Sequence, residues 1–424
     1  MYRAIRPRLT VMNFLQYAVW GAYLTSMGSY LVSVGLASKI GLFYAMQGIV
    51  SMFMPAIIGA IADKFMPAQR VLSLCHGIAG AAMIAASYYG MSAEVINFST
   101  LFALYGLSVA FYMPTIALSN SVAYIGLEGA GYDTVKVFPP IRVFGTVGFI
   151  CSMLFVNFMK GADGVQFQHT YNQFMVSGVL GLILSAYSLT LPNCPVKKGG
   201  EKQSVADILG LKAFALFKNR EMAIFFIFSM LLGVSLQITN GFANPFISHF
   251  KELPEYANAW GANNANALIS LSQVSETLCI LLIPFCMKKF GIKKVMMIAM
   301  LGWVFRFGFF GAGNPGSGVW MFILSCVVYG VAFDFFNVSG SLYVNLKTDT
   351  SIRSSAQGLF MLMTNGVGAS IGTLSAQAIV NHFVYNAAEP NWSAAWYAFA
   401  AYALVVAILF MVLFKEPKTE DKIA

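Results

Sequence analysis

The chain has 424 residues, of which only 10% are charged while 58% are hydrophobic. Soluble domains usually carry about 25% charged and about 45–50% apolar residues, so this composition cannot cover a water-soluble surface. It excludes soluble enzymes, DNA-binding domains and disordered linkers. The net charge of +9 then reflects either an acidic partner or the topology of a membrane protein, and the positions of the basic residues decide between them.

Long apolar runs recur along the chain between short polar stretches. A transmembrane helix needs roughly 20 mostly apolar residues, and the pattern predicts twelve of them in an all-α integral membrane protein. The basic start resembles a signal peptide. Its apolar run, however, is longer than that of a typical signal peptide and contains the polar residues Asn13 and Gln16, so we expect a retained helix. The fourth run is one long tilted helix or is broken at Pro114. The predicted spans are 10–35, 39–62, 70–91, 95–125, 139–160, 171–191, 222–249, 264–287, 294–313, 318–346, 354–384 and 392–414.

The basic residues are distributed unevenly between the two sides of this arrangement. Of the 26 lysines and arginines, 21 fall on one side and only Lys39, Lys160 and Lys251 on the other. Arg142 and Arg306 lie within spans. Because cytoplasmic loops carry the excess of Lys and Arg, both termini are predicted to be cytoplasmic. The positive charge thus serves topology, and no nucleic-acid partner is predicted.

Cysteines and histidines form no recognisable site. None of the six cysteines makes a CxxC pair or clusters with histidine, so we predict neither disulfides nor a metal site. The four histidines are scattered, and we expect them at helix ends or in loops: His76, His169, His249 and His382. The chain has no phosphate-binding GxxxxGK[ST] loop and no nucleophile–base pair, so we predict no cofactor and no enzyme activity.

The chain divides into two similar halves, 1–191 and 222–424, joined by a polar linker. The linker, 192–221, holds six basic residues, and its segment 205–219 has apolar residues at helical spacing, which predicts an amphipathic helix against anionic lipid. GAIADKF resembles PFCMKKF 225 residues later, and VAFYMPT resembles VAFDFFN 222 residues later. A duplicated six-helix unit is the layout of a transporter whose substrate binds near mid-membrane between the halves.

One loop adds a family resemblance. Gly59, Asp63 and Lys64 resemble a reduced copy of the G-x-x-x-D-[RK] motif that follows the second helix in the major facilitator superfamily. The basic tail of the motif is reduced to Arg70, and the second-half copy has Lys288 where the acid would stand. The resemblance implies the two-bundle major facilitator fold, in which this loop latches helix ends on the cytoplasmic side.

Arg142 is the first of four ionisable residues within spans, where such residues are costly and therefore point to function. Arg142, Thr146 and Phe149 are spaced i, i+4, i+7 and share one helix face, which predicts a ligand-facing stripe. Because Pro139 and Pro140 precede Arg142, we expect it in the first helical turn. The alternative is that it extends from the helix end to lipid headgroups.

Three second-half spans each carry a polar pair at spacing i, i+3. One pair could simply join helices by hydrogen bonds, but three pairs that include two carboxyl groups favour a polar cavity. Tyr329 and Phe333 flank these positions, where their rings can stack on a flat ligand. Gln16, Tyr17, Trp20, Tyr112 and Asn120 are further first-half candidates. The pairs are Gln237 with Asn240, Gln273 with Glu276, and Asp334 with Asn337.

The fourth ionisable residue, Arg306, lies in the ninth span, which is peripheral in the major facilitator architecture. We expect it in a buried ion pair or in another role outside the cavity, and we expect Arg306→Ala to spare substrate affinity.

The predicted lining suits a neutral ligand with several hydroxyl groups or ring heteroatoms, such as a nucleoside or a sugar. Removal from water makes a carboxylate bind protons more readily, so Glu276 and Asp334, with Arg142 opposing them, are candidates for proton coupling. Sodium coupling is a further alternative.

These segments also resemble one transporter family closely. FPPIRVFGTVGFI, LQITNGF, SQVSETL and YGVAFDFFNVSGS are similar to the bacterial nucleoside:proton symporter family, and the similarity extends over nearly the whole chain. The resemblance implies a monomeric inner-membrane protein that imports nucleosides such as uridine or adenosine with protons. It also implies the substrate-binding set Arg142, Thr146, Phe149, Gln237, Asn240, Gln273, Glu276, Tyr329, Phe333 and Asp334.

Two alternatives follow from the residues alone. A sugar or other polyol permease would use the same fold. An integral-membrane enzyme or sensor is disfavoured by the missing catalytic pair and by the lack of a sizeable cytoplasmic domain.

Overall fold

The structure is a computed structural model that describes residues 4–194, 196, 211–349 and 352–415. Within these ranges the regular secondary structure is helical, apart from one isolated β-bridge between Lys160 and Gln166. The chain divides into two compact units, 1–208 and 209–424, and the boundary falls inside the predicted linker. Each unit is described separately below.

Ten helical segments in the described ranges are long and apolar enough to cross a membrane. They coincide with ten of the twelve predicted spans. The other two are represented by shorter helices, because the predicted span 10–35 is interrupted and the span 171–191 contains a helix of 17 residues. The ten segments are Ala37–Ala62, Ala68–Ser92, Phe98–Gly129, Lys136–Phe158, Arg220–Glu252, Ala265–Phe290, Ile292–Ala312, Val319–Lys347, Ser355–Tyr385 and Trp392–Leu413.

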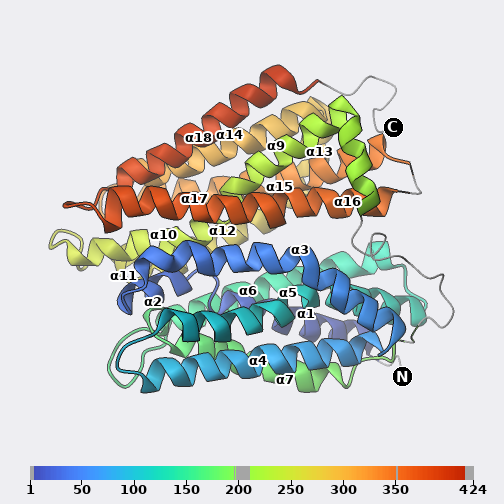
Figure 1. Ribbon diagram of the computed structural model, residues 1–424, viewed down its shortest axis with the longest axis horizontal. Coiled ribbons are helices and arrows are strands. Elements are labelled where there is room, and N and C mark those ends of the chain that lie inside the picture. Colours follow the sequence, from blue (N-terminus) through green and yellow to red (C-terminus); the bar gives the residue numbers. More distant parts are fainter. Residues whose placement is uncertain (1–3, 195, 197–210, 350–351, 416–424) are drawn as a thin grey trace. The chain divides into compact units, whose positions relative to one another are not determined.

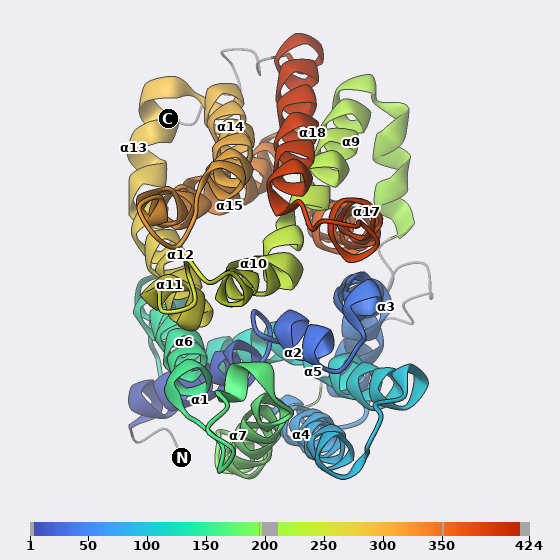
Figure 2. The same ribbon diagram turned by 90° about the vertical axis from the view of Figure 1, so that its left-hand side faces the viewer.

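The helices of unit 1 run along one another, as the end-on view in Figure 2 shows. The fourth predicted span is one continuous 32-residue helix, because Pro114 is accommodated without a break. The Asn97 side chain caps its start by accepting hydrogen bonds from the backbone N–H groups of Ser99 and Thr100. The helices of this unit are α1 (Ile5–Gly21), α2 (Met27–Ser33), α3 (Ile40–Lys64), α4 (Ala68–Ser92), α5 (Phe98–Gly129), α6 (Thr134–Phe158) and α7 (Asn172–Ser188).

The first described element of unit 2 is a 3₁₀ segment, η3 (Leu211–Lys218), and a helical bundle follows it (Figure 1). Its penultimate span contains two π-helical segments, η6 (Leu362–Gly368) and η7 (Asn381–Tyr385), which widen the helix locally. The α-helices of this unit are α9 (Arg220–Leu236), α10 (Ile238–His249), α11 (Trp260–Asn263), α12 (Ala265–Cys279), α13 (Ile283–Phe290), α14 (Ile292–Ala312), α15 (Val319–Lys347), α16 (Arg353–Met361), α17 (Ala369–Val380) and α18 (Trp392–Leu413).

The two units share an architecture that the sequence repeat predicts. In each, the first span is interrupted, between α1 and α2 in unit 1 and at Gln237 between α9 and α10 in unit 2. In each unit, the first and fifth transmembrane spans also cross at a glycine of the fifth span. A Cβ on Gly148 of α6 would press on the backbone of Phe14, and one on Gly372 of α17 would press on the backbone of Val234. Small residues allow this close approach of transmembrane helices.

Candidate functional site

The predicted stripe on α6 lies in the interior of that helix. The helix begins at Thr134, so Arg142 lies in its third turn, and the expectation that the two prolines place it in the first turn is wrong. Pro139 and Pro140 are accommodated within the helix. Arg142 is half-buried, and its guanidinium carbon lies 3.9 Å from the centre of the Tyr17 ring on α1. A guanidinium at this distance over an aromatic face is held by a cation–π interaction, which is not the arrangement expected of a side chain that only reaches for headgroups.

Phe149 continues the stripe two turns further along α6. Its ring is buried and meets the Trp20 ring edge-on, with centroids 6.2 Å apart. Trp20 in turn packs against Tyr112, with centroids 6.0 Å apart. Thr146, between Arg142 and Phe149, is half-buried. Of the first-half candidates, Tyr17 and Trp20 therefore pack against the stripe, and Tyr112 packs behind Trp20.

A buried hydrogen-bonded network lies next to this aromatic support. Gln16 donates from Nε2 to Thr115 Oγ1 at 2.7 Å, so its Oε1 is the acceptor for His76 Nε2 at 2.8 Å. Tyr112 donates its hydroxyl to the Gln16 carbonyl at 2.7 Å. All four side chains are buried. His76 is thus an interior residue of α4, and the expectation of a helix-end or loop position is wrong for it. Its role as a donor to Gln16 depends on a partner 60 residues away, which the sequence pattern does not reveal.

In unit 2, the interruption of the first span carries a predicted pair. Gln237 ends α9 and precedes α10, and its Oε1 accepts a hydrogen bond of 2.8 Å from Asn240 Nδ2. Both side chains are half-buried. An interrupted helix inside a membrane leaves backbone groups and side-chain amides available to a ligand.

The other predicted second-half residues gather around Tyr329 on α15. Its hydroxyl lies close to the side-chain amide of Gln273 on α12 and within electrostatic reach of the carboxyl groups of Glu276 and Asp334. The ring of Tyr329 stacks on Phe333, with centroids 5.6 Å apart and planes 19° from parallel. Residues from two helices, far apart in the sequence, thus form one cluster of stacked rings, an amide and two carboxyl groups.

Arg306 of α14 adjoins the same cluster, which the sequence pattern did not indicate. Only 1% of the residue is exposed, and its guanidinium carbon lies 4.4 Å from the centre of the Tyr329 ring. Its Nη1 donates to Ser272 Oγ at 3.2 Å and to the Ser325 carbonyl at 2.8 Å.

The predicted latch residues lie in the last two turns of α3, not in the loop that follows it. Gly59 is half-buried and faces open space, and Lys64 ends the helix as an exposed residue. The side chain of Asp63 lies outside the described part of the structure.

The predicted amphipathic segment 205–219 is described from residue 211 onward. There η3 buries Ala213 and packs Phe217 against Phe226 of α9, with ring centroids 5.5 Å apart, while Phe214 is 42% exposed. Residues 205–210 lie outside the described ranges.

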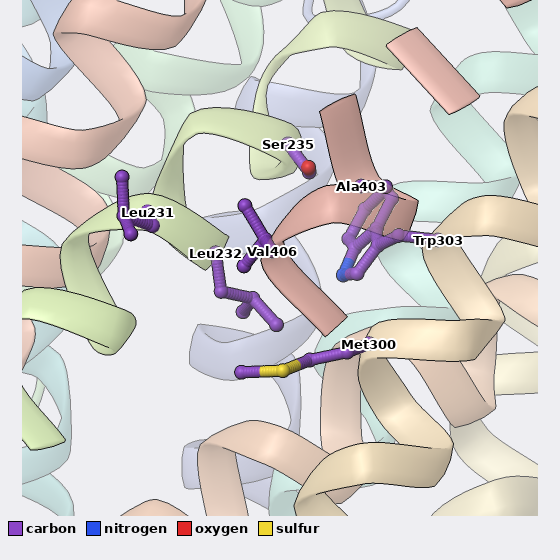
Figure 3. Close-up of a pocket in the computed structure, with 7 residues that line it drawn as sticks. All are labelled: Leu231, Leu232, Ser235, Met300, Trp303, Ala403 and Val406. Atoms are coloured by element: carbon purple, nitrogen blue, oxygen red, sulfur yellow. The ribbon is translucent and has the colours of Figure 1, made fainter. Parts of the chain in front are cut away.

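A small cavity within unit 2 is bounded by α9, α14 and α18. Figure 3 shows its lining, Leu231, Leu232, Ser235, Met300, Trp303, Ala403 and Val406. Its volume of about 10 Å³ is near the limit for one water molecule, whereas pockets for drug-sized ligands have about 300–1,000 Å³. It is therefore not the substrate site. In the described part of the chain, no three His, Cys, Asp or Glu side chains are grouped as a metal site would require.

The comparison with known families identifies the chain. Residues 3–419 match the model of the nucleoside H⁺ symporters. The chain belongs to this family. The xanthosine permease of Escherichia coli (strain K12) is 44% identical over 423 residues, which cover 99% of this chain and 98% of that protein. Nucleoside permease NupG of the same organism is 42% identical over 97% of this chain and 96% of that protein.

Solved structures give the same result for the fold. A crystal structure of a mutant of the nucleoside transporter NupG superposes with a TM-score of 0.90 at 42% identity, covering 97% of this chain and 100% of the other. A D-xylose–proton symporter matches with a TM-score of 0.73 at 13% identity, covering 100% of both chains, and this likeness concerns the fold alone. This nucleoside H⁺ symporter is therefore a multi-pass membrane transporter of the major facilitator type and not an enzyme.

Proposed function

We propose that this protein imports purine and pyrimidine nucleosides across the bacterial inner membrane, together with protons, by alternating access. Full-length similarity to permeases named for nucleosides supports the substrate class. The proposed topology has twelve helices in two six-helix bundles with both termini in the cytoplasm, supported by the excess of basic residues on that predicted side. The protein is proposed to act as a monomer in the lipid bilayer.

The cluster around Tyr329 is the observation that carries this proposal. A nucleoside has a flat base with donor and acceptor edges and a ribose with hydroxyl groups. The ring of Phe333, which is half-buried and stacks on Tyr329, offers a flat apolar surface, and the Gln273 amide offers both a donor and an acceptor. The carboxyl groups of Glu276 and Asp334 can accept hydrogen bonds from hydroxyl groups.

Further substrate contacts are proposed from both units. On α6, the guanidinium of Arg142 supplies hydrogen-bond donors, Thr146 a hydroxyl and Phe149 a ring, and the face of Tyr17 fixes the direction of the guanidinium. In unit 2, Gln237 and Asn240 can exchange their mutual hydrogen bond for bonds to the base. The pair is pre-oriented, which lowers the entropy lost on binding.

Proton coupling is proposed to involve Glu276, Asp334 and Arg142. Asp334 is only 5% exposed and Glu276 is half-buried, so both acids are partly or wholly removed from water. A carboxyl group in that environment exchanges a proton more readily near neutral pH than one in water does. Nucleoside hydroxyl groups bound to a carboxyl group would change its affinity for a proton, which provides the link between substrate and ion.

Uptake of labelled uridine into proteoliposomes tests the proposal. We expect accumulation that depends on an inwardly directed proton gradient and that excess unlabelled adenosine abolishes. Empty liposomes and a matched sodium gradient at constant pH serve as controls. Equilibration without accumulation would refute proton symport. Accumulation of a labelled sugar with no uridine uptake would instead support a polyol permease.

A further inference from the structure

The side chain of Arg306 carries a buried positive charge, and several of the groups next to it are neutral. It lies in the second-last turn of α14, and its guanidinium hydrogen-bonds to the Ser272 hydroxyl on α12 and to the Ser325 carbonyl on α15. Ser325 returns a hydrogen bond of 2.8 Å from Oγ to the Arg306 carbonyl. Burial of a charge is expensive unless hydrogen bonds and polarizable groups replace its water. We therefore expect the buried charge of Arg306 to have a role that a neutral side chain could not fill.

The contacts of Arg306 converge on Tyr329. The guanidinium lies over one face of that ring at 4.4 Å, and its other aromatic neighbour, Phe310, is more distant at 5.4 Å. A planar guanidinium packs on a ring face while donating in its own plane, and a lysine ammonium lacks this geometry. The serine hydrogen bonds on α12 and α15 fix the plane of the guanidinium and thereby the face that it presents to the ring.

Two further aromatic rings also pack against Tyr329. Phe333 stacks on it, and Trp303, one turn before Arg306 on α14, meets it edge-on with centroids 6.0 Å apart. The Gln273 amide lies close to the Tyr329 hydroxyl. Helix α14 therefore supplies two of the side chains that pack against the Tyr329 ring.

We propose that Arg306 is a positioning residue that sets nucleoside affinity by holding the Tyr329 ring. The inference rests on the proposed function, in which Tyr329 contacts the nucleoside. It reverses the expectation from sequence that replacing Arg306 spares affinity. Arg306 acts through the Tyr329 ring face and makes no contact with substrate itself.

A double-mutant cycle on uridine binding to the full-length protein in nanodiscs tests this inference. Arg306→Lys keeps the charge but loses the planar contact, and we expect it to raise the Kd for uridine about tenfold. In a Tyr329→Leu background, which has no ring to hold, the same substitution should change the Kd by less than about twofold. In a Tyr329→Phe background, which keeps the ring, the effect of about tenfold should persist.

The control is Val295→Ala, at a fully buried position of α14 that lies about three turns from Arg306. It is expected to lower the melting temperature while leaving the Kd within about twofold, because it removes only packing. If Arg306→Lys does not yield folded protein, Ser272→Ala replaces it in the cycle. That variant removes one hydrogen bond from the guanidinium, and we expect a Kd about threefold higher that again depends on the Tyr329 ring.

The outcomes separate the inference from the proposed function. If the wild-type protein binds no uridine, the proposed function falls and the inference with it. If the wild type binds and Tyr329→Leu weakens binding, but Arg306→Lys behaves like Val295→Ala, only the inference is overturned. Equal effects of Arg306→Lys with and without the Tyr329 ring would also overturn it, because the residue would then act by another route.

Discussion

Replacing Gly372 on α17 with alanine should push this helix away from α9, the helix that ends at the interruption at Gln237. An ideal Cβ on Gly372 would lie 2.6 Å from both Cα and the carbonyl carbon of Val234, and it would also overlap the Val234 carbonyl oxygen. Ordinary contacts of this kind are about 3.5–4.0 Å, so α17 and α9 must move apart by roughly 1 Å. The obstacles are backbone atoms and cannot rotate away. We expect a loss of about 2–3 kcal/mol in stability, at the upper end of the usual cost of overpacking.

The matched control is Gly358→Ala in the same transmembrane segment, where no atom lies within 4 Å of an added Cβ. Alanine is favoured over glycine inside a helix by about 0.5–1 kcal/mol, so this variant should be slightly more stable than the wild type. Thermal unfolding of both variants in detergent measures the difference, with uridine binding as a second readout. A melting temperature for Gly372→Ala at or above that of the wild type would refute the close-crossing argument.

Three further predictions concern the proposed mechanism and the linker. Asp334→Asn and Glu276→Gln should each lower proton-driven uridine accumulation about tenfold, since each removes a carboxyl group that can carry a proton and accept hydrogen bonds, and wild-type accumulation in both would remove these acids from the site. Tyr17→Leu should raise the KM for uridine about fivefold by releasing Arg142, and an unchanged KM would show that this contact is dispensable. Burial raises the pKa of the Cys194 thiol to about 11. A variant retaining only this cysteine should therefore react slowly with maleimide at about pH 7.5 and faster as the pH rises toward 11. Rapid labelling at the lower pH would contradict the burial of the thiol.

Hydropathy predicts the helices well because transmembrane length and apolarity are local properties. It does not report whether a run is continuous. The first span breaks after Gly21 and the seventh at Gln237, and neither break contains proline. Both depend on tertiary packing that lets the chain satisfy its backbone groups without a regular helix. At Pro114, in contrast, the sequence indicates a possible break, but the helix continues through it.

The candidate site shows the same division between local and long-range information. Spacing along one helix places Arg142, Thr146 and Phe149 on one face, and ionisable residues in apolar runs mark Glu276 and Asp334 for attention. The family resemblance supplies the proposed ligand. Spacing cannot show that the Gln273 amide lies close to the Tyr329 hydroxyl, because that proximity depends on how two helices are rotated toward each other.

The buried network in unit 1 illustrates what remains hidden in the sequence. His76 is separated from Gln16 by 60 residues, and Gln16 from Thr115 by 99. Each residue alone is compatible with a loop, a helix end or an interior position. Only the packing of α1, α4 and α5 brings these residues together. The sequence pattern alone therefore indicated the commoner positions for His76, a helix end or a loop.

The burial of Arg306 also constrains how the protein is made. When α14 enters the membrane during synthesis, an arginine inside an apolar helix costs up to about 2.5–3.5 kcal/mol. The groups that compensate it are the Ser272 hydroxyl on the preceding span and the Ser325 carbonyl on the following one. The three helices α12, α14 and α15 are therefore most stable when they leave the insertion machinery as a group. The hydrogen bonds of Arg306 therefore favour the packing of α12, α14 and α15 against one another as unit 2 assembles in the membrane.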